Sequence, residues 1–223
     1  MIVARADLSV NPAKAPFGGS GKEWYVEYTP HVLPRGMIIT ISGNIGSGKS
    51  TIAKRLAKRL GYPTLDVGAL RRAEAKRRGM TLAAFNTWAE KHPKAGDRAF
   101  DQKFSQTARR QRNIIVTGRM AYHFLPESFK VFLKVSAQEG ARRTLANHSD
   151  RPNEFHAEIH LPSLVRLHQQ RIRSDVRRYR KAYNVNILNL KQYDYILDTS
   201  RIPIPTVVQK VTAAFRSWQK EQR

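Results

Sequence analysis

Eight consecutive residues have the types and spacing of a phosphate-binding loop. Gly43-Asn44-Ile45-Gly46-Ser47-Gly48-Lys49-Ser50 matches G-x-x-x-x-G-K-[ST] at every defined position. The glycines let consecutive backbone N–H groups face a phosphate at the positive end of the following helix. Lys49 is expected to reach the β- and γ-phosphate oxygens, and the Ser50 hydroxyl is the expected Mg²⁺ ligand. We therefore predict that this loop and Thr51 bind ATP with Mg²⁺, and that Lys49 is catalytic.

Several arginines have the chemistry to hold a second phosphate. Arginine keeps its charge and binds phosphate through a bidentate fork. Arg119 comes just after a buried strand, where open α/β sheets usually place ligand groups. Arg171, Asp175 and Arg178 lie at i, i+4 and i+7 and so share one helix face. By spacing alone, these three are more typical of an ion pair on a solvated helix surface.

The elements that must position these residues alternate along the chain. The expected strands are 37–42, 63–66, 113–117, 131–135 and 195–198. The expected helices are 49–60, 68–78, 81–90, one that begins at Ser136 in a capping box with Glu139, 162–183, and one from about 205. Strands that alternate with helices predict an α/β fold in which a parallel sheet is covered on both faces.

Charge and composition narrow the class of protein. The chain has 223 residues, 40 Lys and Arg against 17 Asp and Glu, and a net charge of +23. Such an excess favours a polyanionic partner, such as nucleic acid, nucleotides or an acidic membrane surface. The absence of cysteine excludes disulfides, cysteine-ligated zinc and a cysteine nucleophile. No apolar run is long enough to span a membrane, and the chain is expected to be soluble and cytoplasmic.

The first 36 residues differ from the rest and are expected to form an N-terminal extension. Residues 11–22 are rich in Pro, Gly and small side chains and resemble a linker. This extension has four basic and three acidic residues, so the body, residues 37–223, carries +22 of the +23.

The body resembles the cytidylate kinases, and most closely the compact archaeal-type and related bacterial cytidylate kinase-like proteins. The resemblance covers about residues 37–215 and rests on motifs that occur in the same order. These are the phosphate-binding loop, Leu65-Asp66-Val67-Gly68-Ala69-Leu70-Arg71-Arg72, Gly79-Met80-Thr81-Leu82, Val116-Thr117-Gly118-Arg119, Arg171…Asp175…Arg178-Tyr179 and Tyr193-Asp194-Tyr195-Ile196-Leu197-Asp198-Thr199-Ser200.

The resemblance implies a nucleoside monophosphate kinase fold of the P-loop NTPase class, with a five-stranded parallel sheet. Residues 68–112 would be the monophosphate-binding segment and residues 147–161 a mobile lid. The implied reaction is ATP-dependent phosphorylation of CMP or dCMP to CDP or dCDP. The implied catalytic residues, besides Lys49, are Arg119, Arg171 and Arg178. The implied substrate ligands are Asp66, Gly68, Arg72, Arg119, Arg171, Asp175 and Arg178.

The chain departs from the family pattern at two positions. Thr117 stands where familiar members often have a carboxylate, and Val67 stands where some relatives place a serine that touches the pyrimidine nucleotide. Asp66 is either an acceptor for the cytosine amino group or a helix cap at the end of a strand. Arg72 is not distinguished from its neighbour Arg71.

Two further groups are weaker candidates. Arg142, Arg143 and Arg151 would either close over ATP or remain solvated charges. His156 and His160 lie one helical turn apart, but they lack the order of a zinc-binding helix and an evident third ligand.

The alternative is a basic kinase-fold protein that binds RNA or a ribonucleoprotein particle such as the ribosome, with reduced or no kinase activity. Its support is the charge of the body, which exceeds what a nucleotide site needs. The basic face expected to carry such binding contains Arg109, Arg110, Arg112, Arg173, Arg177 and Arg180. The complete phosphate-binding loop favours the kinase.

Overall fold

The computed structural model describes residues 36–92, 94–111, 113–147 and 160–222. Its strands are β1 (Ile38–Gly43), β2 (Thr64–Asp66), β3 (Ile114–Thr117), β4 (Phe129–Lys134) and β5 (Tyr195–Asp198). Its α-helices are α1 (Lys49–Leu60), α2 (Val67–Arg77), α3 (Leu82–Lys91), α4 (Ala99–Arg109), α5 (Ala121–Phe124), α6 (Ala137–Ala146), α7 (Leu161–Tyr183) and α8 (Ile204–Glu221). A π-helical turn, η1 (Lys94–Arg98), leads into α4, and a 3₁₀ turn, η3 (Leu190–Gln192), precedes β5.

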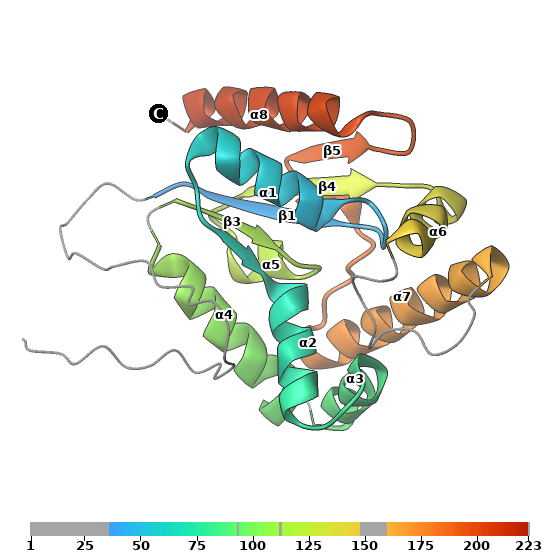
Figure 1. Ribbon diagram of the computed structural model, residues 1–223. Helices are drawn as coiled ribbons and strands as arrows, with labels where there is room; N and C mark the ends of the chain where they lie inside the picture. Colours follow the sequence, from blue (N-terminus) through green and yellow to red (C-terminus); the bar gives the residue numbers. More distant parts are fainter. Residues whose placement is uncertain (1–35, 93, 112, 148–159, 223) are drawn as a thin grey trace, which may run out of the picture. The chain divides into compact units, whose positions relative to one another are not determined.

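The five strands form one parallel sheet in the order β2-β3-β1-β4-β5. The sheet and its covering helices confirm the expected α/β architecture (Figure 1). Because all strands run in one direction, the residues that follow β1, β2 and β3 gather at one edge of the sheet. The order therefore brings the phosphate-binding loop close to the residues that follow the other two strands.

Alternate residues of the central strand enter separate cores, as strand geometry requires. Ile39 and Ile41 of β1 pack with apolar side chains of α1 and α8 on one face of the sheet. Ile38 packs on the other face with α4 and α5, mainly through Phe100 and Phe104. The hydrophobic run of β1 thus fixes the phosphate-binding loop to a strand buried on both sides.

The structure contains helices that the sequence analysis did not expect, and one expected feature is incomplete. We did not expect the short α5 or α4, although Phe100, Phe104 and Ala108 form the buried stripe of α4 at helical spacing. The predicted capping box at the start of α6 is half formed. Ser136 Oγ accepts the Glu139 N–H at 3.3 Å, whereas the Ser136 N–H donates to Ser200 Oγ at 3.0 Å.

Parts of three expected segments lie outside the described residues. They are residues 1–35 of the N-terminal extension, residues 93 and 112 of the monophosphate-binding segment, and residues 148–159 of the lid, with Arg151 and His156. Within the described part of the chain, no helix combines the length and the apolar character needed to cross a membrane.

Candidate functional site

The loop between β1 and α1 has the curled backbone that phosphate binding requires. Gly46 and Gly48 have φ angles of 77° and 84°, in the left-handed region that strains other residues. The Lys49 ammonium donates hydrogen bonds to the carbonyl oxygens of Gly43 and Asn44, at 3.0 and 2.7 Å. Lys49 therefore reaches back over the loop at the N-terminus of α1, where the helix dipole favours an anion.

Helix α6 packs directly against this loop at two glycines. A Cβ on Gly46 would lie 2.1 Å from the carbonyl oxygen of Gly140, and a Cβ on Gly140 would lie 2.5 Å from that of Ile45. Both positions therefore exclude a side chain unless the backbone moves. Sequence analysis missed Gly140, because a glycine in a helical pattern does not show what packs against it.

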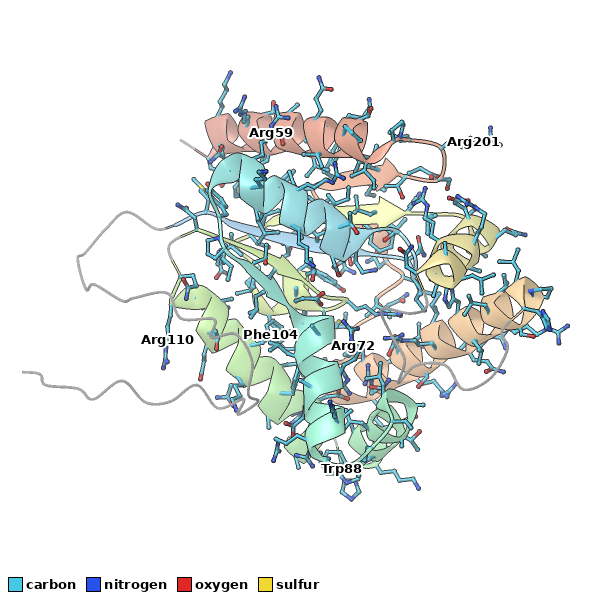
Figure 2. All side chains as sticks on the ribbon, viewed as in Figure 1. Arg59, Arg72, Trp88, Phe104, Arg110 and Arg201 are labelled. Carbon is cyan, nitrogen blue, oxygen red and sulfur yellow. The ribbon has the colours of Figure 1, made fainter. Side chains whose placement is uncertain are left out.

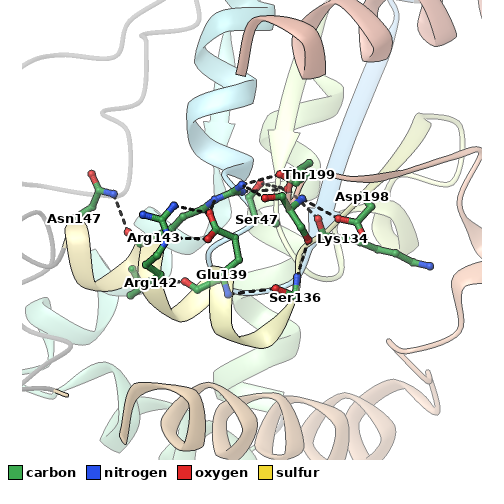
Figure 3. Close-up of polar contacts among 12 residues, drawn as sticks. Ser47, Lys134, Ser136, Glu139, Arg142, Arg143, Asn147, Asp198 and Thr199 are labelled. Carbon is green, nitrogen blue, oxygen red and sulfur yellow. Dashed lines mark hydrogen bonds and ion pairs between the residues drawn. The ribbon is translucent and has the colours of Figure 1, made fainter. Parts of the chain in front are cut away.

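Polar groups at the ends of β4 and β5 support the loop from another side (Figure 3). The Asn44 side-chain oxygen accepts a hydrogen bond from the Val135 N–H at 3.2 Å. The Thr199 hydroxyl lies 2.9 Å from the carbonyl oxygen of Lys134 and 3.4 Å from that of Ser47. Val135, which follows β4, and Thr199, which follows β5, thus hydrogen-bond to the loop.

Ser50 and Asp66 bring a hydroxyl and a carboxylate together beside the loop. Ser50 Oγ donates to one Asp66 oxygen at 2.8 Å, and the other oxygen accepts the Ala69 N–H at 3.1 Å. The second bond confirms Asp66 as the N-cap of α2. In the sheet, Asp66 also pairs in register with Thr117. Thr117 is the position where, by the resemblance, cytidylate kinases often have a carboxylate. Hard oxygen donors of this kind suit Mg²⁺, so these residues fit the metal that such a loop uses.

The turn after β3 brings Arg119 to the same edge of the sheet. Ser42, the residue before the loop, donates its hydroxyl hydrogen bond to the Gly118 carbonyl oxygen at 2.7 Å. Val67 packs on Gly118 so closely that a Cβ there would lie 3.1 Å from the Val67 Cβ. The start of α2 and the base of the phosphate-binding loop thus both contact the Gly118-Arg119 turn.

A buried carboxylate on α7 binds two arginines. Arg119 Nη1 lies 2.5 Å from one oxygen of Asp175, and Arg178 Nη2 donates to the other oxygen at 2.7 Å. Burial alone would raise the pKa of Asp175, but the charges of Arg119, Arg178 and Arg171 outweigh it and hold the pKa below its usual value. Asp175 and Arg178 are buried, so the interpretation of these two residues as an ion pair on a solvated surface is wrong.

Arg178 lies behind Asp175 and is 2% exposed. Its Nη1 donates to the Asn86 side-chain oxygen at 2.9 Å and lies 3.5 Å from Asp97. Arg71 donates to the same Asn86 oxygen at 2.8 Å and lies 2.9 Å from Asp97. The two arginines thus cross-link α7 to α2, α3 and η1. To contact a phosphate directly, Arg178 would have to exchange these partners.

The structure also separates the neighbours Arg71 and Arg72. Arg71 is buried in the cross-link, whereas Arg72, labelled on α2 in Figure 2, is partly exposed. A Cβ on Gly68 would lie 3.2 Å from an Asp66 oxygen and 3.5 Å from Arg72 Nη1. Arg72, Gly68 and Asp66 are therefore close together, as a shared substrate role requires.

A third buried carboxylate, after Asp175 and Asp97, lies next to the cross-link. Tyr183 at the end of α7 donates its hydroxyl hydrogen bond to Asp101 of α4 at 2.6 Å. Burial raises the pKa of Asp101 to about 7, against the opposing effects of this hydrogen bond and of the Arg71 charge. Sequence analysis did not single out Asp101, because it did not predict α4.

The remaining weaker candidates lie in the sequence on either side of residues 148–159. Arg142 is exposed and bonded to Glu139 at 2.7 Å, and Arg143 donates to the Thr199 carbonyl oxygen at 2.7 Å. His160 is exposed just before α7. Among the residues that the structure describes, no group of three His, Cys, Asp or Glu side chains could hold a metal ion.

Comparison with known proteins identifies the relatives of this chain. Residues 38–201 match the model of the Cytidylate kinase-like family. The cytidylate kinase of Methanocella arvoryzae is 34% identical over 166 residues, which are 74% of this chain and 89% of that protein. The S-adenosylmethionine-dependent nucleotide dehydratase of Lacinutrix mariniflava is 32% identical over 72% of this chain, but the match spans 32% of that protein.

Solved structures show the same fold at lower identity. The shikimate kinase of Bacteroides thetaiotaomicron superposes with a TM-score of 0.54 and 21% identity, over 81% of this chain and 98% of that one. The likeness supports the fold of the sheet and loop.

Proposed function

The chain belongs to the cytidylate kinase-like family, and from this we propose that it transfers the γ-phosphoryl group of ATP to CMP or dCMP. The observation that carries the proposal is the contact between the two phosphate-binding regions. The hydrogen bond from Ser42 to Gly118 joins the loop of Lys49 to the turn of Arg119. Two phosphates can thus be held at neighbouring strand ends, as in-line transfer requires.

On the donor side, the loop from Gly43 to Thr51 binds the phosphates of ATP. Lys49 exchanges its two carbonyl acceptors for phosphate oxygens and neutralises charge that develops on them during transfer. Ser50 and Asp66 are the residues that would hold Mg²⁺, which when bound neutralises charge on the donor phosphates. Positioning and charge neutralisation supply the catalysis, so no covalent intermediate with the protein is needed.

On the acceptor side, Arg119 and Arg171 bind the phosphate of the monophosphate. Asp175 holds one edge of the Arg119 guanidinium and leaves its other N–H groups for the substrate. Arg178 fixes Asp175 in the conformation described here, and its direct contact with a phosphate stays a prediction. Arg72 and Gly68 complete this side. The contact between Asp66 and the cytosine amino group likewise stays a prediction.

The test is a panel of nucleoside monophosphates with ATP and Mg²⁺. We expect CMP or dCMP to be the best acceptor and UMP the next best. Lys49→Ala should lower turnover by several orders of magnitude and leave the fold intact, because a loop lysine contributes little to the core. Lys54→Ala, the same change at an exposed position of α1, is the control. Turnover of AMP equal to that of CMP would overturn the cytidylate assignment, and an active Lys49→Ala would overturn the role of the loop.

A further inference from the structure

Helices α1 and α8 present a basic surface that the proposed phosphoryl transfer does not use. They lie side by side over one face of the sheet (Figure 1) and share one apolar core. Their exposed cations are Lys54, Arg55, Lys58, Arg59, Lys210, Arg216 and Lys220. Arg59 is labelled on this surface in Figure 2. We call these seven residues the α1–α8 face.

The charge of the α1–α8 face is not balanced locally. Within the described residues, none of the seven cations forms an ion pair. Glu221 is the single acidic residue in the two helices. Soluble surfaces usually intersperse both signs of charge, because like charges repel one another. A polyanion bound to this face would relieve the repulsion.

The arginines of the basic face expected from the sequence are weaker candidates for binding a polyanion, because some have acidic partners and others belong to a surface with fewer cations. Arg109 is paired with Glu127 at 3.1 Å, and Arg112 lies outside the described residues. The exposed cations of α7 are Arg166, Arg173, Arg177, Arg180 and Lys181. Arg177 lies 3.8 Å from Glu90. The α1–α8 face therefore has more cations and fewer counter-charges than α7.

We propose that the α1–α8 face binds the phosphate backbone of double-stranded RNA. Lys54 and Lys58 lie one turn apart on α1, and Lys210 extends the charge onto α8, so a charged backbone can be contacted across both helices. Exposed Gln209 and Ser217 of α8 offer hydrogen bonds to 2′-hydroxyls, which the wide and shallow minor groove of RNA displays. Such binding is tolerant of sequence, because phosphates carry no base information.

The composition of this face disfavours two other polyanions. Single-stranded nucleic acid is usually bound by stacking bases on exposed aromatic rings. The aromatic residues of α8 are Phe215, which is buried, and Trp218, which is partly buried. A membrane surface needs apolar side chains that insert into lipid. Ile204, at the N-terminus of α8, is the single exposed large apolar residue in the two helices.

The experiment compares two variants of the full-length protein that lose the same charge. The first carries Lys54→Gln, Lys58→Gln and Lys210→Gln on the α1–α8 face. The control carries Arg166→Gln, Arg173→Gln and Arg180→Gln on α7. Glutamine is a good helix former, so both should fold, which circular dichroism and thermal unfolding check. Binding to a labelled RNA duplex of about 20 base pairs is measured by anisotropy from about 50 to 200 mM salt, with saturating ATP present.

We expect wild-type binding that weakens steeply with salt. The triple variant on the α1–α8 face should reduce the slope of log K against log salt by roughly two to three units, and the α7 control by less than one. If both variants lowered the slope equally, the binding would depend on charge spread over the whole protein. That result would overturn the assignment of RNA binding to the α1–α8 face. Tighter binding to a DNA duplex of equal length, to single-stranded RNA or to anionic vesicles would overturn the assigned partner. If the wild-type protein showed no binding to the RNA duplex at about 50 mM salt, the proposal would be overturned entirely.

Discussion

Arg119 follows β3 and Asp175 lies in the middle of α7, yet their side chains form an ion pair of 2.5 Å. The Asp175 side chain is 4% exposed, whereas that of Arg119 is 19% exposed. The carboxylate is therefore shielded from water, while part of the Arg119 side chain remains accessible. Asp175 thus sets the direction in which Arg119 presents its remaining N–H groups.

We predict that Asp175→Asn lowers both stability and affinity for the acceptor nucleotide. The amide keeps the shape of the carboxylate but leaves Arg119 and Arg178 without their shared counter-charge. Removing one partner of a buried ion pair costs about 3–5 kcal/mol. Urea unfolding should show a loss of this order, and the KM for CMP should rise at least about tenfold because Arg119 is no longer oriented.

Asp198→Asn is the matched control for that measurement. Asp198 is exposed and accepts a hydrogen bond from the Ser200 N–H at 2.8 Å, which an asparagine oxygen can also accept. We expect stability and KM close to those of the unaltered protein. An equal effect of the two substitutions would contradict a special role for Asp175.

Asp66→Asn tests whether this carboxylate serves the metal site. Asparagine is as good an N-cap as aspartate, so the start of α2 and the fold should be preserved. The loss of a negative charge beside Ser50 should weaken Mg²⁺ binding, because Mg²⁺ prefers carboxylate ligands. Titration of ATP at increasing Mg²⁺ should show that the variant needs about tenfold more metal for half-maximal ATP affinity.

An unchanged Mg²⁺ requirement for ATP binding would count against this role of Asp66. If, in addition, Asp66→Asn raised the KM for CMP more than the KM for UMP, a contact with the cytosine amino group would be favoured instead.

The buried Asp101 should make stability depend on pH. Burial raises its pKa to about 7, whereas an aspartate in the unfolded chain has a pKa of about 3.9. Between these values the folded state binds more protons than the unfolded state, so its stability falls as the pH rises and the loss levels off above about pH 7. Asp101→Asn removes this titration and keeps an oxygen acceptor for Tyr183.

Urea unfolding of both proteins at several pH values measures the effect. From about pH 5 to 7, the unaltered protein should lose roughly 2 kcal/mol of stability relative to Asp101→Asn. A difference between the two proteins that stays constant over this range would show that Asp101 does not titrate there.

The sequence predicted those features that depend on local pattern. The spacing of Gly43, Gly48 and Lys49 predicted the phosphate-binding loop, and β-branched runs predicted the central strands. The i, i+4 and i+7 spacing of Arg171, Asp175 and Arg178 showed that they share a face of α7. Helical spacing cannot show what covers a face, so the burial of Asp175 and Arg178 and the contacts of Arg178 with α3 and η1 needed the structure.

The sequence pattern also could not show which of two neighbouring arginines, Arg71 or Arg72, is buried. Arg71 and Arg72 are both arginines on one helix, and only the packing of α2 against η1 separates the buried one from the one near Gly68. The α4 stripe of Phe100, Phe104 and Ala108 was visible in the sequence. Polar residues between these positions, and the π-helical turn before them, obscured the start of the helix.

Gly140→Ala provides the last prediction, because two effects of opposite sign compete there. Alanine in place of glycine inside a helix normally stabilises by about 1 kcal/mol. At this position its Cβ would lie 2.5 Å from the Ile45 carbonyl oxygen and 3.1 Å from Val135 Cγ1. Overpacking of this kind typically costs about 1–3 kcal/mol, and the nearest atom belongs to the backbone of the phosphate-binding loop. We therefore expect the cost of overpacking to exceed the gain in helix stability, so that Gly140→Ala destabilises the protein.

The expected result of Gly140→Ala is a displaced loop, with ATP bound about tenfold more weakly and a lower unfolding temperature. Calorimetric titration of ATP and a thermal unfolding scan measure the two effects. Gln138→Ala, at an exposed position of the same helix, tests for any change caused by helix propensity alone. If Gly140→Ala instead raised the unfolding temperature and left ATP affinity unchanged, α6 could not be packed against the loop as closely as the structure has it. The loop is therefore expected to depend for its shape on a glycine far from its own sequence motif.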